Sequence, residues 1–309
     1  MYDILIIGAG PAGLTAAIYA QRAGKQTLII EKSTFGGQMT FSPKIENYPG
    51  FEAISGNELA DKMVAQALGL GAEVEFAAVT GIEEAEENGK KYFLVATADE
   101  EKYAARAVIV ASGAEHRRLG LPGEEELIGH GISFCAVCDG AFYAGEDVAV
   151  IGGGNSAIVE AALLAETSKS VTVIQNLSDL TGEKVTADAL RARDNVRVIC
   201  DTVVEGYEAV GGELTGLRLR NTATGEGSVL KIAGTFIAIG LKPANDAFAD
   251  LLDLDRWGYA AADERCTTRT AGIFVAGDCR TKAVRQISTA AADGAAAALA
   301  ACAWIDRNA

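Results

Sequence analysis

The first hydrophobic pattern in the chain is a short apolar run that leads into a glycine-rich turn. Tyr2–Ile7 reads as a buried strand and is followed directly by Gly8-Ala9-Gly10-Pro11-Ala12-Gly13. A helix pattern then covers about Leu14 to Ala23, and a second strand over Gln26–Ile30 ends at Glu31. Apolar runs that follow a helix in this way are typical of parallel strands buried on both faces. The N-terminal segment is therefore predicted to be a βαβ unit.

The same succession occurs a second time near the middle of the chain. The strand pattern Asp147–Ile151 leads into Gly152-Gly153-Gly154-Asn155-Ser156-Ala157. A helix pattern continues to about Glu166, and the strand Val171–Ile174 follows. A repeated unit of this kind indicates two nucleotide-binding folds in one chain.

The remaining patterns fill in the two folds. An amphipathic helix is predicted over Glu58–Leu70, and the segment Glu73–Tyr103 alternates short strands with turns such as Asn88-Gly89, as in an antiparallel meander. Further strands and a long alanine-rich helix are predicted at Ala107–Ala111, Val196–Cys200, Leu217–Leu230, Thr235–Gly240, Ile273–Asp278 and, for the helix, Gln286–Trp304.

These elements predict an α/β protein with two Rossmann-like three-layer nucleotide-binding domains, the second inserted into the first. The predicted outer domain is discontinuous and comprises residues 1–115 and 243–309, and the predicted inserted domain comprises residues 116–242. A length of 309 residues is consistent with two domains.

Composition narrows the class of protein. Hydrophobic residues make up 49% and charged residues 22%, as in ordinary soluble proteins. The net charge of −15 argues against nucleic acid as a partner. The pattern predicts neither an apolar run as long as a membrane span nor a signal peptide. We therefore expect a cytoplasmic protein without membrane association.

The first glycine motif has the context that a dinucleotide site requires. The glycines let the backbone approach a pyrophosphate at the start of a helix, and the acid at the end of the second strand can hold a ribose hydroxyl. Strand, helix and Glu31 are all in register with Gly8, Gly10 and Gly13. A GxGxxG motif alone would be weak, but in this context it predicts dinucleotide binding.

The chemistry of the chain is predicted to centre on Cys135-Ala136-Val137-Cys138-Asp139. Two thiols at this spacing can close a disulfide, and one can attack a partner while the other resolves the mixed disulfide. A zinc site would need a second pair of ligands, whereas the other cysteines are scattered and the only histidines are His116 and His130. Zinc binding and inert buried cysteines remain the alternatives to redox chemistry. The four single cysteines are expected to be buried: Cys200, Cys266, Cys279 and Cys302.

Taken together, the motifs resemble those of the low-molecular-weight thioredoxin reductase family of flavoproteins. The resemblance covers essentially the whole chain, and the residues that carry it are the two glycine motifs, Gly36-Gly37-Gln38, Cys135-Ala136-Val137-Cys138-Asp139-Gly140, Gly277-Asp278 and Arg285-Gln286. It implies that the discontinuous domain binds FAD and that the inserted domain is an NAD(P)H-binding-like domain. It also implies a homodimer formed through the FAD domain and thioredoxin as the protein substrate.

The resemblance further implies a set of FAD-binding residues. The pyrophosphate would lie on Gly10, Ala12 and Gly13, the adenosine ribose at Glu31 and Lys32, and the adenine near Val79. Gly37, Gln38 and Asn47 would line the flavin side, with Asp278 on the ribityl chain or the pyrophosphate. Arg285, Gln286 and Ile287 would lie near the flavin ring. The remaining residues of the predicted site are Gly8, Pro11, Ala111 and Gly277.

Roles in catalysis follow from the same resemblance. Cys138 would face the isoalloxazine and take its electrons, and Cys135 would attack the disulfide of the substrate. Asp139 would give and accept protons for the thiols. The alternative for Asp139 is a structural helix N-cap. No metal site is predicted.

The chain departs from the family at the second nucleotide site. Gln175 lies 23 positions after Gly152, as Glu31 lies 23 positions after Gly8, so an amide stands where an NAD site favours a carboxylate. Members of the family that use NADPH carry a His-Arg-Arg-x-x-x-Arg run here, whereas residues 175–183 of this chain contain no arginine and two acids. A phosphate placed there would lack charge-assisted hydrogen bonds of about 1.5–3 kcal/mol each.

The chain therefore resembles the ferredoxin-dependent flavin thioredoxin reductases, which lack the arginine run. Ferredoxins near −400 mV and thioredoxin near −270 mV make the transfer downhill by roughly 6 kcal/mol for two electrons. Ferredoxins are usually acidic, so docking on a chain of net charge −15 would need a local basic cluster, for which Arg117-Arg118 and Lys282 with Arg285 are candidates.

Three alternatives are kept: an NADH- or NADPH-dependent thioredoxin reductase, an FAD-dependent dithiol oxidase that uses oxygen, and a non-enzymatic FAD-binding module. A hinge is expected near Leu119-Gly120 and Gly240–Lys242, because the dithiol must reach both flavin and substrate.

Overall fold

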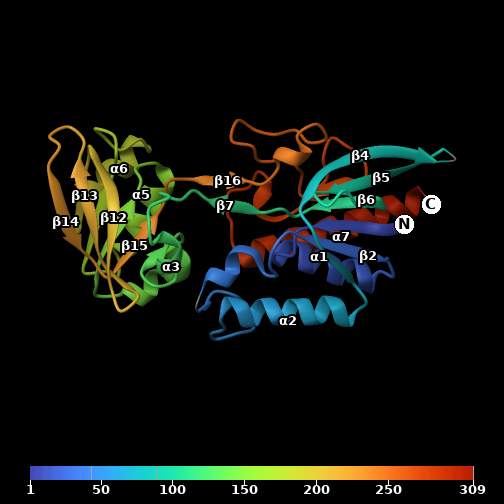
Figure 1. Ribbon diagram of the computed structural model, residues 1–309, viewed down its shortest axis with the longest axis horizontal. Helices are drawn as coiled ribbons and strands as arrows, with labels where there is room; N and C mark the ends of the chain where they lie inside the picture. The colour runs from blue at the N-terminus through green and yellow to red at the C-terminus, as the bar shows by residue number, and fades with distance from the viewer. Residues whose placement is uncertain (43, 88, 309) are drawn as a thin grey trace. The chain divides into compact units, whose positions relative to one another are not determined.

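The computed structural model describes residues 1–42, 44–87 and 89–308 of the chain. The chain forms two compact units, which we treat separately (Figure 1). Unit 1 contains residues 1–115 and 242–309, and unit 2 contains residues 116–241. Each unit is built on its own sheet, and each sheet has a glycine-rich turn after its central parallel strand.

Unit 1 contains a seven-stranded sheet in which β1 is flanked by β2 and β6 as parallel neighbours. The strand order is β3-β2-β1-β6-β5-β4, and β17 pairs with β6. The strands are β1 (Tyr2–Ile7), β2 (Thr27–Glu31), β3 (Glu73–Phe76), β4 (Val79–Glu87), β5 (Lys90–Thr97), β6 (Lys102–Val110) and β17 (Ile273–Val275).

The buried strands of unit 1 send alternate side chains into two different cores. Ile4 and Ile6 belong to a cluster that includes residues of the helices. Leu5 and Ile7 belong to a second cluster with Phe93 of the antiparallel strands. Because side chains alternate along a strand, an unbroken apolar run is required where both faces are covered. The parallel part of the sheet is therefore covered by helices on one face and by residues of the antiparallel strands and of the segment around Phe248 on the other.

Among the described residues, the α-helices of unit 1 are α1 (Pro11–Arg22), α2 (Gly56–Gly69) and α7 (Ile287–Arg307). Helices α1 and α7 cross closely at Gly294, where a Cβ would lie 2.1 Å from the carbonyl oxygen of Ala12. Helix α2 begins with a capping box between Ser55 and Glu58, which satisfies backbone N–H groups at its start. Three short 3₁₀ helices complete the unit: η1 (Gly37–Phe41), η3 (Asp246–Phe248) and η4 (Gly277–Cys279).

Helix α7 is long and apolar enough to cross a membrane by length and composition alone. The expectation that no apolar run approaches this length is therefore wrong for α7. Its alanine-rich face is nevertheless packed inside unit 1, with Ala297, Ala298 and Ala301 fully buried in the helix-side core. The small side chains let α7 lie close against α1 in that core.

The antiparallel meander of unit 1 begins later in the chain than the sequence predicted. Glu73–Phe76 is not part of the antiparallel meander, because β3 pairs in parallel with β2 and forms the edge of the parallel sheet. Its two glutamates gave it the polarity of a meander strand. The meander itself comprises β4, β5 and β6. In the predicted Asn88-Gly89 turn, residue 88 lies outside the described residues.

Unit 2 contains a five-stranded parallel sheet in the order β11-β10-β9-β15-β8 and a separate three-stranded sheet, β12-β13-β14. The strands of the parallel sheet are β8 (Ile132–Ser133), β9 (Asp147–Ile151), β10 (Ser170–Ile174), β11 (Val196–Ile199) and β15 (Gly234–Ile237). The antiparallel strands are β12 (Thr202–Val210), β13 (Glu213–Asn221) and β14 (Gly227–Lys231).

The parallel sheet of unit 2 is also covered on both faces. Val148 and Val150 pack in a core with helix residues, and Ala149 and Ile151 pack in another with β12 and β13. The helices are α3 (Glu124–Leu127), α4 (Ala136–Asp139), α5 (Asn155–Leu164) and α6 (Lys184–Arg191), with the 3₁₀ helix η2 (Gly140–Tyr143). The structure thus has two α/β lobes with Rossmann-like sheets, as the sequence predicted.

Two short strands, β7 (Ala114–His116) and β16 (Leu241–Pro243), pair with each other where the chain passes between the units. The predicted hinge at Leu119-Gly120 is displaced from this crossing. Leu119 lies inside unit 2, where its N–H donates to Glu124 and its side chain packs on the core.

Candidate active site

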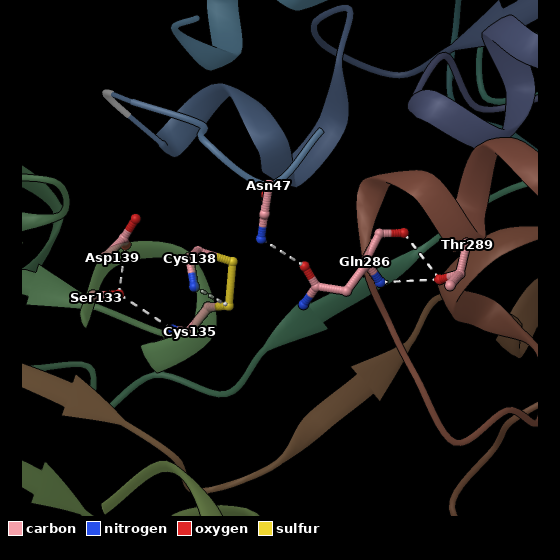
Figure 2. The surroundings of a disulfide bond; sticks show 7 residues. All are labelled: Asn47, Ser133, Cys135, Cys138, Asp139, Gln286 and Thr289. Carbon is pink, nitrogen blue, oxygen red and sulfur yellow. Dashed lines mark hydrogen bonds between the residues drawn. A yellow bond between two sulfur atoms is a disulfide. The ribbon is translucent and has the colours of Figure 1, made fainter. Parts of the chain in front are cut away.

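Cys135 and Cys138 form a disulfide within unit 2 (Figure 2). Cys135 is the N-cap of α4, and the backbone N–H of Cys138 donates to Cys135 Sγ at 3.2 Å. A donated hydrogen bond and the start of a helix both stabilise negative charge on a sulfur. The geometry therefore favours Cys135 as the sulfur that carries a thiolate after reduction.

The alternatives for the two cysteines do not match this arrangement. The two sulfurs are bonded to each other, and both residues are partly accessible rather than buried. Among the described residues, no group of three or more histidines, cysteines and acids is placed to hold a metal ion.

Asp139 lies at the end of α4 and is held by one neighbour. Its Oδ2 accepts a hydrogen bond of 2.6 Å from the hydroxyl of Ser133, and its Oδ1 is buried without a hydrogen-bond partner among the described residues. Burial raises the pKa of Asp139, and the Ser133 hydrogen bond opposes that rise. Asp139 stands at the N-cap position of η2, but its side chain makes no helix-capping hydrogen bond there. A carboxyl with a raised pKa is suited to hold a proton beside the dithiol.

Ser133 was not identified from the sequence. It is the last residue of β8 and is buried. Besides donating to Asp139, its hydroxyl accepts a hydrogen bond of 3.2 Å from the backbone N–H of Cys135 (Figure 2). The serine thus joins Asp139 to Cys135 through two hydrogen bonds. A serine two positions before a cysteine has no pattern that would indicate this role.

In unit 1, two glycines of the first motif lie close to the backbone of the chain itself. Gly8 has a φ of +103°, and a Cβ there would lie 2.4 Å from the carbonyl oxygen of Ala111. A Cβ on Gly13 would lie 1.9 Å from the carbonyl oxygen of Gly8. Gly10, the N-cap of α1, has no atom within 4 Å of the position of a Cβ. The space over Gly10, in front of Pro11 and Ala12, is open to a ligand.

The acid at the end of β2 faces the same turn. Glu31 is buried, and its Oε2 accepts a hydrogen bond of 2.7 Å from the backbone N–H of Ala9. Its Oε1 accepts one from the N–H of Ser33. Lys32 instead points away to an exposed ion pair with Glu115 at 2.6 Å. Glu31 therefore lies at the glycine turn, whereas Lys32 is held elsewhere by a carboxylate.

The loop after β2 returns to the glycine turn. The N–H of Gly36 donates to the carbonyl oxygen of Ala9 at 2.8 Å, and Gly37 lies against Gly10, with 3.5 Å between a built Cβ and the Gly10 Cα. Both glycines have positive φ, which favours glycine. Gln38 follows as an exposed residue of η1.

The remaining predicted residues of unit 1 lie on several elements. Val79 is the first residue of β4, and Ala111 follows β6 and donates to Ile7. Asn47 donates to Gln286 at 3.2 Å (Figure 2), and Gln286 is the N-cap of α7, in a capping box with Thr289. Ile287 is the first residue of α7 and is partly buried.

Gly277 and Asp278 form the start of η4, close to α1. A Cβ on Gly277 would lie 2.9 Å from the Ala12 Cβ. Asp278 Oδ1 is buried and has no hydrogen-bond partner among the described residues. Burial raises the pKa of Asp278, while Lys282 and Arg285 act in the opposite direction. An unpartnered buried carboxylate oxygen is costly, so it indicates that a ligand donates a hydrogen bond here.

The two basic candidates for partner docking differ in accessibility. Lys282 is largely buried and bonded to Asp293, which also binds Arg280. Arg285 stacks on Tyr259, with its guanidinium carbon 4.1 Å from the ring centroid. Arg118 is paired with Glu125. The predicted docking clusters are therefore largely committed to contacts within the chain.

The second glycine motif repeats the first in part. Gly152 has a φ of +128°, and a Cβ there would lie 2.4 Å from the carbonyl oxygen of Ala238, as at Gly8 and Ala111. Gly154 is the N-cap of α5, but Ala157 replaces the third glycine. The backbone of a Rossmann turn is thus retained in unit 2.

Gln175 stands at the position that would select a nucleotide, and its side chain binds other residues of the chain instead. Gln175 is buried; its Nε2 donates to the carbonyl oxygen of Asp179 at 3.2 Å, and its Oε1 accepts from the N–H of Asn176. The side chain lies against Gly153, where a Cβ would be 2.3 Å from Nε2. Both ends of the amide therefore bind the chain's own loop.

The loop after β10 also contains an acid, Asp179, that is paired within unit 2. Asp179 binds Arg191 of α6 at 2.5 Å, and this guanidinium lowers the pKa of the acid. Arg193 is paired with Glu166 at 2.6 Å. These two arginines, which follow the loop in sequence, are thus bound to carboxylates rather than presented to a phosphate.

The single cysteines are mostly buried, as expected. Cys266, Cys279 and Cys302 are buried, whereas Cys200 is only partly buried. Cys279 Sγ approaches the carbonyl oxygens of Ala276 and Val110 at 3.3 and 3.6 Å, which places it within the core of unit 1.

Comparison with known proteins gives consistent results along the whole chain. Residues 2–294 match the pyridine nucleotide-disulphide oxidoreductase family. A thioredoxin reductase of Listeria monocytogenes is 43% identical over 95% of this chain and 91% of the relative. A bifunctional thioredoxin reductase/thioredoxin of Mycobacterium leprae is 42% identical over 100% of this chain and 67% of the relative. The crystal structure of a thioredoxin reductase from Streptococcus pyogenes, 40% identical, matches with a TM-score of 0.93 over 99% of both chains.

Proposed function

Because this chain belongs to the pyridine nucleotide-disulphide oxidoreductase family, we propose that it is a flavin-dependent thioredoxin reductase that takes electrons from reduced ferredoxin. FAD is its cofactor, as in the thioredoxin reductases of this family. When bound, FAD accepts single electrons and passes on a pair. The observation that carries the choice of donor is the self-bound Gln175.

The residues of unit 1 fit FAD. The open space over Gly10 admits a pyrophosphate at the start of α1, where backbone N–H groups favour an anion. Glu31 is placed at the same turn to accept from a ribose hydroxyl. Asp278 retains an unpartnered buried oxygen, which a hydroxyl of the cofactor can satisfy. Gly37 leaves room beside Gly10 on the flavin side.

In the proposed reaction, the thiolate of Cys135 attacks one sulfur of the thioredoxin disulfide. A bond forms between the Cys135 and thioredoxin sulfurs, and the thioredoxin disulfide breaks. Asp139 gives its proton to the sulfur that leaves. Cys138 then gives its proton to the ionised Asp139 and attacks Cys135, which restores the disulfide. The second thioredoxin sulfur leaves, takes this proton from Asp139 and is released as a thiol.

Three features of the structure support these roles. The N–H of Cys138 and the start of α4 stabilise a thiolate on Cys135. Asp139 has a raised pKa, so it holds a proton to higher pH than an ordinary aspartate. The names of the relatives indicate thioredoxin as the substrate. The relative from Mycobacterium leprae is named as a thioredoxin reductase and a thioredoxin in one chain.

The donor assignment rests on unit 2. A ribose would have to displace the contact between Gln175 and Asp179, and a 2′-phosphate would meet an acid rather than free arginines. Both changes disfavour a nicotinamide nucleotide relative to a protein donor. The homodimer and the cytoplasmic location stay predictions.

An anaerobic titration distinguishes the donors. We expect reduced ferredoxin to bleach the flavin absorbance of the holoenzyme within seconds and to support thioredoxin reduction. NADPH and NADH should bleach it at least a hundredfold more slowly at equal concentration. Rapid bleaching by NADPH would contradict the donor assignment but not the dithiol mechanism. Peroxide release with a small dithiol and no thioredoxin turnover would instead favour the oxidase alternative.

A further inference from the structure

Glu160 is a partly buried acid on α5 that the proposed mechanism does not use. The backbone N–H of Ala136, the first residue of α4, donates a hydrogen bond to its carboxylate. Its Oε2 is buried and has no hydrogen-bond partner among the described residues. The carboxyl therefore lies at the start of the short helix that carries the redox cysteines.

The surroundings of Glu160 do not offer a compensating cation. Burial raises its pKa to about 8, and the Ala136 N–H opposes that rise. Across the described chain, no ion pair involves Glu160, and the charged groups of the neighbouring elements bind one another: Lys184 with Asp188, Arg191 with Asp179, and Asp147 with Lys169. The titratable groups on the α4 side are Cys135, Cys138, Asp139 and Tyr143.

We propose that Glu160 is a positioning residue for the dithiol: its carboxyl, held at the start of α4, controls through its charge how readily Cys135 becomes a thiolate. A protonated Glu160 leaves the helix start free to stabilise the sulfur. An ionised Glu160 places a negative charge there and disfavours the thiolate. Since the coupling is mutual, a thiolate on Cys135 also keeps Glu160 protonated.

The electron and proton balance of the reduction is complete with these groups. Breaking the Cys135–Cys138 bond takes two electrons, which the reduced flavin would supply in the proposed function. One proton is taken up by the sulfur of Cys138. Cys135 keeps its negative charge as long as Glu160 retains its proton, and takes up a second proton when Glu160 ionises. The inference rests on the proposed function of the dithiol, but not on the identity of the electron donor.

The test measures thiol reactivity rather than turnover. The holoenzyme is reduced with dithiothreitol under anaerobic conditions and desalted, and the rate of Cys135 alkylation by iodoacetamide is followed by peptide-resolved mass spectrometry from pH 5 to 10. In the wild type, we expect a profile broadened by the ionisation of Glu160 near pH 8. In E160Q, which keeps the shape of the side chain, the profile should steepen and its midpoint should fall by about one pH unit.

Two further variants complete the comparison. E160D keeps a carboxyl and should keep the broadened profile, and E166Q, which removes an exposed acid just after α5, should match the wild type. A profile of E160Q that superimposes on that of the wild type overturns the inference. If the wild type shows no ferredoxin-dependent activity while the alkylation profiles of E160Q and the wild type still differ, only the proposed donor is contradicted.

A second measurement uses only the wild type and so does not depend on the folding of E160Q. In protein labelled with ¹³C-carboxyl glutamate, one resonance should titrate near pH 8 in the oxidised enzyme. The same resonance should titrate at higher pH after reduction of the disulfide. Equal titration in both redox states overturns the proposal.

Discussion

The hydroxyl of Ser133 bridges Asp139 and Cys135: it donates to Asp139 Oδ2 at 2.6 Å and accepts from the Cys135 N–H at 3.2 Å. Ser133→Ala should therefore slow thioredoxin reduction about three- to tenfold, which corresponds to the net contribution of one hydrogen bond. Since the serine lowers the pKa of Asp139, its loss should also move the ionisation of Asp139 to higher pH. Rates measured from pH 5 to 9 check both effects.

Ser168→Ala is the matched control for this change. Ser168 is another buried serine of unit 2, and its hydroxyl has no partner among the described residues. Its replacement should leave the rate and the pH profile unchanged. A Ser133→Ala enzyme with the wild-type pH profile would contradict the role given to the bridge.

Gly10→Ala should separate cofactor binding from folding. No protein atom lies within 4 Å of the added Cβ, so the melting temperature of the apoprotein should stay within about 2 °C of the wild type. The methyl group would occupy the space proposed for the pyrophosphate, and FAD affinity should fall at least tenfold. Fluorescence titration of the apoprotein with FAD measures the affinity.

Gly69→Ala provides the comparison for that experiment. Gly69 is the last residue of α2, also with no atom within 4 Å of an added Cβ. This variant should bind FAD as the wild type does. Unchanged FAD affinity in Gly10→Ala would show that the pyrophosphate lies elsewhere.

Two arginines in the loop after β10 should create a response to NADPH. Asn176 and Leu177 are exposed, so the double variant N176R/L177R presents two guanidinium groups without disturbing the core. Paired with a 2′-phosphate, they should raise the rate of flavin bleaching by NADPH at least tenfold. Stopped-flow absorbance measures that rate, with NADH as the nucleotide lacking the phosphate.

An exposed arginine elsewhere tests whether charge alone suffices. Val185 on α6 is 81% exposed, and Val185→Arg should not improve the response to NADPH. Equal gains for NADPH and NADH in the double variant would indicate that phosphate recognition is not the reason.

His116 should make the stability of the protein fall in acid. Burial, with a smaller effect from Arg118, lowers the pKa of His116 from its ordinary 6.5 to about 4. Below pH 6.5 the unfolded chain therefore takes up a proton that the folded chain does not bind. The contribution of the neutral His116 to the unfolding free energy is thus complete above that pH and is lost as the pH falls toward 4. Between pH 7.5 and 5 the loss should be about 2 kcal/mol of unfolding free energy.

His116→Phe should reduce that acid sensitivity. The ring of His116 stacks on Phe134 with a centroid distance of 4.8 Å, and phenylalanine can keep this contact without a titrating group. Chemical denaturation at pH 5 and 7.5 measures the difference. An unchanged difference between the two pH values in His116→Phe would exclude this histidine as its source.

The parts of the fold that could be predicted are those encoded by local patterns. The strand–glycine–helix units were recognisable because each begins with a glycine that faces a close backbone approach, Gly8 at Ala111 and Gly152 at Ala238. Counting from Gly8 and Gly152 also identified Glu31 and Gln175 as equivalent positions, because each follows the same strand, turn and helix. Helix α6 was missed because it has only eight residues and lacks a side-chain cap.

The parts that could not be predicted depend on contacts between segments distant in sequence. Ser133 binds Asp139 because a turn brings that acid back beside it, and Glu160 meets Ala136 because α5 and the first residue of α4 share one core. The self-binding of Gln175 depends on the path of the following loop. None of these relationships has a period or a spacing that the sequence displays.

The pairing of β7 with β16 has a consequence for how such chains are assembled. The N–H of Arg117 donates to the carbonyl oxygen of Gly240 at 3.0 Å, so unit 2 leaves and rejoins the chain at neighbouring points. The N–H of Ala244 donates to Gly113 at 3.2 Å, so the interrupted ends of unit 1 are neighbours too. A domain whose two ends are adjacent can be exchanged between proteins by recombination at this one strand pair, without other changes in the protein that receives it.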